Sequence, residues 1–238
     1  MSESDTPRHS SEHGPRGHGS DADRDALKRF DESREMNYER WKEGTGYDLE
    51  AMLSLSEPDR MAIERSLIPA KDWRDVEALL ALNTSRAAQA LRDATKSDDV
   101  GLRMAVIRRA PHLVDEALRL ESLLMALESA APFGGLSQTL DEVEAFHPPA
   151  AIEALFRGLL NRPGDVAYHF ATSLAVIHGN ISHRYDWSLR PQLLSFNTTD
   201  ITERRQAFLM LYDLLNTSRP LENAVVAEMA RSLRSTNR

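Results

Sequence analysis

The sequence contains no cysteine among its 238 residues. This absence excludes disulfide scaffolds, thiol nucleophiles, iron–sulfur clusters and cysteine-based zinc sites. A metal site would have to be built from His, Asp and Glu side chains alone. None of these residues recurs at a rigid ligand spacing, so we expect neither a metal nor a cofactor.

Basic residues are also in the minority. Lys and Arg number 29 against 37 Asp and Glu, and the formal net charge is −8. Nucleic-acid binding depends on clustered Lys and Arg that neutralise phosphates, so the charge balance disfavours a nucleic-acid partner. An acidic chain instead favours a basic partner.

Long hydrophobic runs are missing as well. No apolar segment approaches the roughly 18 residues of a membrane helix, and the N-terminus lacks the apolar core of a secretory signal. We therefore expect a cytoplasmic protein with no membrane partner.

The N-terminal segment is poor in hydrophobic side chains. Residues 1–35 hold only Met1, Ala22, Ala26, Leu27 and Phe30 among Ser, Gly, His and charged residues. Such a segment cannot bury enough apolar surface to fold alone. We predict a disordered, dispensable polar tail over residues 1–35, followed by one domain over residues 36–238.

From Ser56 onward the hydrophobic pattern has the period of an α-helix. Residues 152, 155, 156, 159 and 160, all Ile, Leu or Phe, follow the i, i+3, i+4, i+7, i+8 spacing of a core face. Asp72 and Thr84 are placed to cap helices, and no segment alternates as a β-strand does. The pattern predicts an all-α fold. Short antiparallel helix pairs at a spacing of about 30–40 residues favour an α-solenoid, with an irregular bundle as the alternative.

Two resemblances refine this prediction. Residues 76–94 (VEALLALNTSRAAQALRDA) and 98–103 (DDVGLR) resemble a HEAT-like repeat, which implies closely packed helix pairs. A second set of segments is similar to bacterial HEAT-like immunity proteins of polymorphic toxins; it comprises residues 38–41 (YERW), 46–49 (GYDL), 146–149 (FHPP), 169–171 (HFA), 178–179 (HG), 186–187 (DW) and 196–198 (FNT). This resemblance implies a non-catalytic cytoplasmic protein that neutralises a cognate toxin.

The connection between Gly179 and Thr199 is the segment that most strongly indicates function. Connections between helices usually span two to eight residues, and long ordered ones tend to carry function. Trp, Tyr and Arg are enriched in binding hot spots. The segment supplies our candidate partner-binding residues Tyr185, Asp186, Trp187, Arg190 and Phe196. The alternative is that Trp187 and Phe196 only fill a gap between helices.

Glu144, His147 and His178 complete the candidate partner-binding surface. Glu144 and His147 have the i, i+3 spacing of di-iron bundles, but the second pair that such a site needs is missing. His169 is expected to be a hydrogen-bonded core residue. An enzyme with a polar His/Glu pocket, either a hydrolase or a DNA-repair-like HEAT protein, remains the alternative to a protein-binding scaffold.

Overall fold

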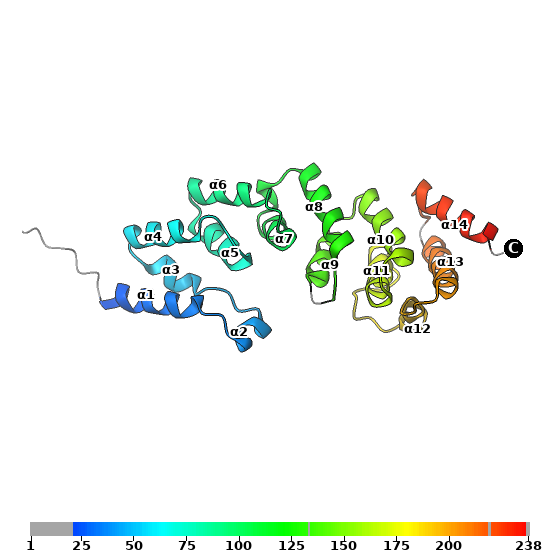
Figure 1. Cartoon of the computed structure of the whole chain (residues 1–238), viewed down its shortest axis with the longest axis horizontal. Coiled ribbons are helices and arrows are strands. Elements are labelled where there is room, and N and C mark those ends of the chain that lie inside the picture. The colour runs from blue at the N-terminus through cyan, green and yellow to red at the C-terminus, as the bar shows by residue number, and fades with distance from the viewer. Residues whose placement is uncertain (1–20, 133, 219, 237–238) are drawn as a thin grey trace, which may run out of the picture. The chain divides into compact units, whose positions relative to one another are not determined.

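The structure is a computed structural model, and it describes residues 21–132, 134–218 and 220–236. The chain divides into two units, residues 1–66 and residues 67–238. Both are built from helices (Figure 1), and the described residues contain no β-strand beyond isolated bridges at Ala131. The predicted all-α class is confirmed. None of the helices in the described ranges is long and apolar enough to cross a membrane.

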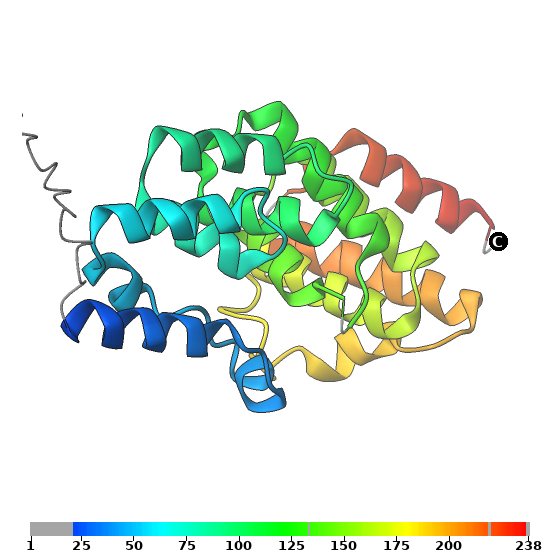
Figure 2. The same ribbon diagram turned by 60° about the vertical axis from the view of Figure 1, so that its left-hand side comes forward.

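From residue 21 on, where the structure describes it, the first unit is built from α1 (Asp21–Arg34), α2 (Tyr38–Glu43), α3 (Leu49–Ser54) and α4 (Glu57–Leu67). Helix α1 packs against α3, and the two run side by side in Figures 1 and 2. Phe30 of α1 is fully buried and meets Tyr47 edge to face, with ring centroids 5.7 Å apart. This contact gives α1 a hydrophobic anchor.

Polar contacts fix the same junction. Ser33 Oγ donates to the Phe30 carbonyl at 2.6 Å and accepts from the Asp48 backbone N at 2.9 Å. Asp48 caps α3 by accepting from Ala51 N at 2.8 Å, and Arg29 Nη2 donates to it at 2.9 Å. The hydrogen bond from Ala51, helped by Arg29, lowers the pKa of Asp48.

The predicted disordered tail is therefore wrong for residues 21–34. The apolar stripe of Ala26 and Phe30 is too narrow to fold alone, but α3 supplies a partner for it. Residues 1–20 of the predicted tail lie outside the described residues. The division at residue 66 also differs from the predicted boundary at residue 35.

The second unit begins with the end of α4 and contains the remaining helices. They are α5 (Trp73–Leu82), α6 (Ser85–Ala94), α7 (Val100–Arg109), α8 (Glu116–Ser129), α9 (Leu136–Ala145), α10 (Pro149–Asn161), α11 (Gly164–Ile177), α12 (Arg190–Leu193), α13 (Ile201–Ser218) and α14 (Ala224–Thr236), with 3-10 turns η1 (Pro111–Leu113) and η2 (Leu194–Phe196).

Single residues account for several helix starts, as predicted. Asp72 accepts hydrogen bonds from the backbone of Arg74 and Asp75, and Thr84 accepts one from Ala87. Such caps satisfy donors that the first turn leaves free.

The start of α13 also depends on Thr198. Asp200 accepts from the backbone N of Thr202 and of Glu203. The Glu203 carboxylate accepts from Thr198 Oγ1 at 2.6 Å, and the Asp200 backbone N donates to that same hydroxyl at 3.1 Å. Thr198 thus links Asp200 and Glu203, the two residues that a capping box would join directly.

The core of the second unit is formed by consecutive and alternate helices. Helix α7 contacts α5 and α9, α9 contacts α11, α8 contacts α10, and α10 contacts α13 and α14. The predicted stripe of α10 is confirmed, because Leu155, Phe156 and Leu159 are fully buried. Gly158 lets α11 approach closely, since a Cβ at this position would lie 2.4 Å from the Phe170 ring.

Candidate functional site: an exposed aromatic loop

The segment between α11 and α13 combines an irregular part with two short helices. Gly179, at φ +74°, directly follows His178, the C-terminal cap of α11. Residues 178–189 lack regular helix, and α12 and η2 then lead to α13. The long connection therefore has an irregular part, residues 178–189, and an anchored part, residues 190–196.

Phe196 belongs to the anchored part. Its side chain is fully buried, as is that of Leu193, and η2 packs against α11 and α13. Phe196 is therefore a core residue, and its prediction as a partner-binding residue is wrong. The 3-10 turn of η2 directs the ring inward between two long helices, where burial of an aromatic side chain stabilises the fold.

Tyr185 and Trp187 belong to the irregular part. Their exposures are 78% and 70%. The guanidinium of Arg190 lies over the Trp187 ring, with Cζ 3.8 Å from the centroid. This cation–π contact covers one face of the indole. The segment thus displays two large aromatic side chains at the surface.

Asp186 shapes the turn between these two aromatic residues. Its carboxylate accepts from Ser188 N at 2.9 Å, and its backbone N donates to the His183 carbonyl at 2.9 Å. The hydrogen bonds from Ser188 are the main reason that the pKa of Asp186 is lowered. Asp186 therefore positions the turn as an ionised acceptor.

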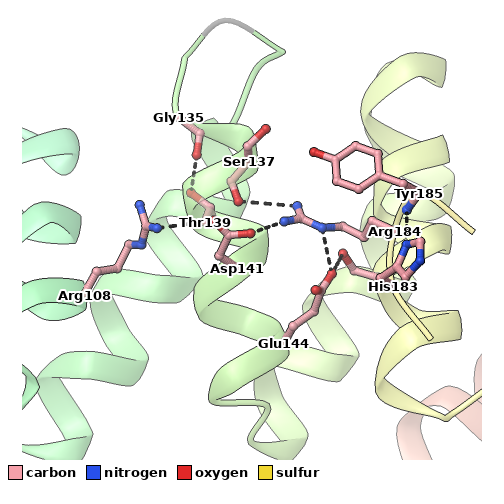
Figure 3. A network of polar contacts seen from close by, with 10 residues as sticks. Arg108, Gly135, Ser137, Thr139, Asp141, Glu144, His183, Arg184 and Tyr185 are labelled. Atoms are coloured by element: carbon pink, nitrogen blue, oxygen red, sulfur yellow. Dashed lines mark hydrogen bonds and ion pairs between the residues drawn. The ribbon is translucent and has the colours of Figure 1, made fainter. Parts of the chain in front are cut away.

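Arg184 fastens the irregular part to α9 (Figure 3). Its side chain is only 15% exposed and forms ion pairs with Asp141 and with Glu144, where Nε lies 3.1 Å from Oε1. Nη1 also donates to the Ser137 carbonyl at 3.4 Å. The residue next to Tyr185 is thus held at several points on one helix.

The two carboxylates have further partners. Ser173 Oγ of α11 donates to Glu144 Oε1 at 2.6 Å, and Arg108 Nη2 of α7 lies 3.3 Å from Asp141 Oδ2. The network therefore joins α7, α9, α11 and the loop. Arg184, Asp141 and Ser173 were not among the predicted site residues. The one feature of the sequence that could have pointed to Arg184 is its position directly before Tyr185, a predicted site residue.

The structure separates the other predicted polar residues. Glu144 joins the network beneath the loop, whereas His147 is exposed just beyond α9, with its Nδ1 3.2 Å from the Glu144 carbonyl oxygen. His178 is half buried and caps the C-terminus of α11. Glu144 thus supports the surface, while the two histidines occupy helix ends.

His169 is half buried on α11 beside Tyr168, with ring centroids 5.1 Å apart. Burial, reinforced by the positive charge of Arg184, lowers the pKa of His169, and Asp165 opposes this shift. His169 is only half buried, which differs from the fully buried position expected of a core residue. No three His, Asp or Glu in the described ranges form a cluster that could hold a metal ion.

An apolar groove of about 590 Å³ lies elsewhere, where α14 meets α10. Leu160, Val225, Met229 and Leu233 line it, and Glu228 is its one ionisable lining residue. Comparison of the chain with protein-family models, with curated proteins and with solved structures gave no match.

Proposed function

We propose that this chain is a non-catalytic helical scaffold that binds another protein through the surface formed by Tyr185, Trp187 and Arg190. The observation that carries the proposal is the exposure of two large aromatic side chains on a segment whose neighbouring arginine is nearly buried. Trp, Tyr and Arg are the residue types that most often form binding hot spots. A protein partner would bury the aromatic faces that now contact water.

Preorganisation of the loop supports this role. Arg184 fixes the segment on α9, Asp186 holds the turn, and Arg190 restrains the Trp187 ring. A surface that is already ordered loses less conformational entropy on association than a mobile one. The aromatic side chains can therefore bind with less ordering cost.

The scaffold itself is proposed to be a HEAT-like α-solenoid of antiparallel helix pairs. In the segment that resembles a repeat, Ala87, Ala90 and Ala94 are buried on α6, and α6 contacts both α5 and α7. Small residues on a helix face allow close approach of its neighbours. Contacts between alternate helices, such as α8 with α10 and α9 with α11, support stacked repeats.

The proposed partner is a basic protein. On the resemblance to immunity proteins, we propose that this partner is a cognate toxin and that binding takes place in the cytoplasm. The acidic excess is unevenly distributed. Residues 1–66 carry 16 acids and 10 bases, whereas residues 67–238 carry 21 acids and 19 bases. Electrostatic steering of a basic partner would therefore depend mainly on the first unit, and it would weaken as salt is added.

The enzyme alternative has less support. Its central acid, Glu144, already accepts a hydrogen bond from Ser173 and pairs with Arg184. Both contacts are made to Oε1, so this carboxylate oxygen is already occupied by groups of the protein itself. Its geometry suits a structural role under the loop.

Differential capture tests the proposal. The immobilised wild-type chain, a Tyr185→Ala/Trp187→Ala double variant and a Met210→Ser control are exposed to extract from the source cells. Met210 is an exposed hydrophobic residue on α13, so its replacement removes apolar surface outside the loop. We expect a protein retained by the wild type and the control but lost from the double variant. Equal retention on all three would contradict the proposal.

A further inference from the structure

Arg103 of α7 is a nearly buried cation with an unusual environment. The residue is 9% exposed, and its Nη2 donates to the sulfur of Met125 on α8 at 3.3 Å. Its Nε is buried and has no hydrogen-bond partner. A thioether is a weak acceptor, so this sulfur leaves the guanidinium poorly satisfied.

Other arginines in the chain use the same edge of the guanidinium differently. Nε and Nη2 point along one side of the group, and this side is suited to an oxygen acceptor. At 2.8–3.3 Å it contacts oxygen in Arg29 with Asp48, Arg74 with Asp72, Arg92 with Gln89, and Arg204 with the Thr198 carbonyl. At Arg103 the position of the oxygen is taken by sulfur.

Arg204 provides the closest comparison, because it is also nearly buried. The Thr198 and Leu160 carbonyls accept hydrogen bonds from its guanidinium. Leaving buried charged donors without oxygen acceptors costs free energy that such carbonyls normally offset. The two residues therefore share burial and differ in their acceptors.

Met125 is placed to act as a removable cover. Its side chain is 40% exposed although its sulfur contacts the buried guanidinium. Methionine is unbranched and has several rotatable bonds, so it can move aside at low cost. One turn earlier on α8, Ser122 carries a buried Oγ that also has no hydrogen-bond partner. The contacting helices α7 and α8 thus each carry a buried polar atom with unused bonding capacity, Arg103 Nε and Ser122 Oγ.

We infer that the Nε/Nη2 edge of Arg103 is a binding site for a carboxylate, which enters when the Met125 side chain moves aside. A carboxylate supplies two oxygens and a negative charge, and it therefore matches the fork and neutralises the buried cation. The neighbouring Arg108 and Arg109 are already paired with Asp141 and Glu77. This inference does not depend on the proposed function.

The carboxylate has two possible sources, a free small carboxylic acid or an acidic residue of a peptide. Nuclear magnetic resonance of the Nε–Hε groups of the ¹⁵N-arginine-labelled full chain distinguishes them, with sodium acetate and N-acetyl-aspartate amide as probes at pH 7 and constant ionic strength. The Nε–Hε signal that disappears in Arg103→Lys is assigned to Arg103. The Arg204 signal serves as the internal control. Thermal unfolding checks that each variant is folded.

We expect a saturable shift of the Arg103 signal with at least one probe and no shift of the Arg204 signal. Met125→Ala should tighten binding about fivefold or more, because the open conformation no longer competes with the cover. Tighter binding of acetate assigns a free acid, and tighter binding of the aspartate derivative assigns a peptide. The absence of a saturable shift in both the wild type and Met125→Ala would overturn the inference.

Glu121 provides a further check, because it is exposed on α8 one turn before Met125. If Glu121 were the carboxylate that Arg103 binds, Glu121→Gln would shift the Arg103 signal without any probe, and that result would also overturn the inference. We expect Glu121→Gln to leave both the signal and its response to the probes unchanged.

Discussion

Arg184 Nε lies 3.1 Å from Glu144 Oε1, and this ion pair joins the aromatic loop to α9. The pair is largely shielded from water, and Ser173 on α11 donates to the same carboxylate oxygen. Exposed Tyr185 directly follows the arginine in the chain. A buried contact therefore determines where an exposed aromatic side chain is presented.

Replacement of Arg184 tests this anchor. We expect Arg184→Ala to lower the free energy of unfolding by about 2–3 kcal/mol, because Glu144 loses its ion-pair partner in a partly buried site and Asp141 loses one of its two arginine partners. Arg157→Ala is the control, since its ion pair with Glu153 is mostly exposed on the arginine side and should change stability by less than about 0.5 kcal/mol. Urea unfolding measures both. Equal effects would refute the anchoring role.

Phe196 and Trp187 should respond in opposite ways to truncation. Phe196→Ala empties a fully buried position and should cost about 3–5 kcal/mol of stability. Trp187→Ala should cost no more than about 1 kcal/mol, the scale of an exposed cation–π contact. Chemical unfolding of the two variants under identical conditions compares them. A large loss of stability in Trp187→Ala would reassign Trp187 to the core.

The sequence was sufficient to predict the helices because their signals are local. Asp72 and Thr84 mark helix starts within a few residues, and the α10 stripe lies within one helix. Helix α1 escaped prediction because its stripe is stabilised by α3, and Tyr47 lies 17 positions beyond Phe30. A contact at that separation leaves no trace in the local pattern.

Local signals were also enough to single out the aromatic segment, but not to tell how its side chains are buried. Composition singled out the segment between α11 and α13 as a candidate, but Trp187 and Phe196 are alike in residue class and opposite in burial. Their difference arises from how η2 packs against α11 and α13. Arg184 escaped because its partners, Asp141 and Glu144, are 40 or more positions away. Sequence spacing cannot show which distant helix receives a side chain.

His169 predicts a pH dependence of stability. Burial and Arg184 hold its pKa below the ordinary value, so the unfolded chain binds the proton more readily than the folded chain. Its contribution to stability is therefore complete above the unfolded pKa of about 6.5. It is lost as the pH falls through that value toward the folded pKa.

Proton nuclear magnetic resonance of the imidazole should show this lowered pKa directly. In Arg184→Ala the pKa of His169 should rise, since a nearby positive charge is removed. His169→Gln should flatten the change in stability between pH 7 and pH 5 relative to the wild type. An imidazole pKa at or above its ordinary value in the wild type would disprove this account.

The first unit should depend on α1. Phe30→Ala removes a fully buried ring and should destabilise this unit by about 3–5 kcal/mol. Hydrogen exchange of amides in α3 reports on the unit specifically, and exchange there should accelerate. Deletion of residues 1–20 is the control, because it leaves α1 whole. Unchanged protection of α3 in Phe30→Ala would show that α1 is dispensable.

Binding and stability measured together on Trp187→Ala test the central claim most directly. The binding partner is the protein identified by differential capture, and calorimetry supplies its affinity. The account predicts affinity lower by at least about 2 kcal/mol, roughly 30-fold, with the thermal midpoint nearly unchanged. Unchanged affinity, with or without a loss of stability, would contradict the claim that this loop binds another protein.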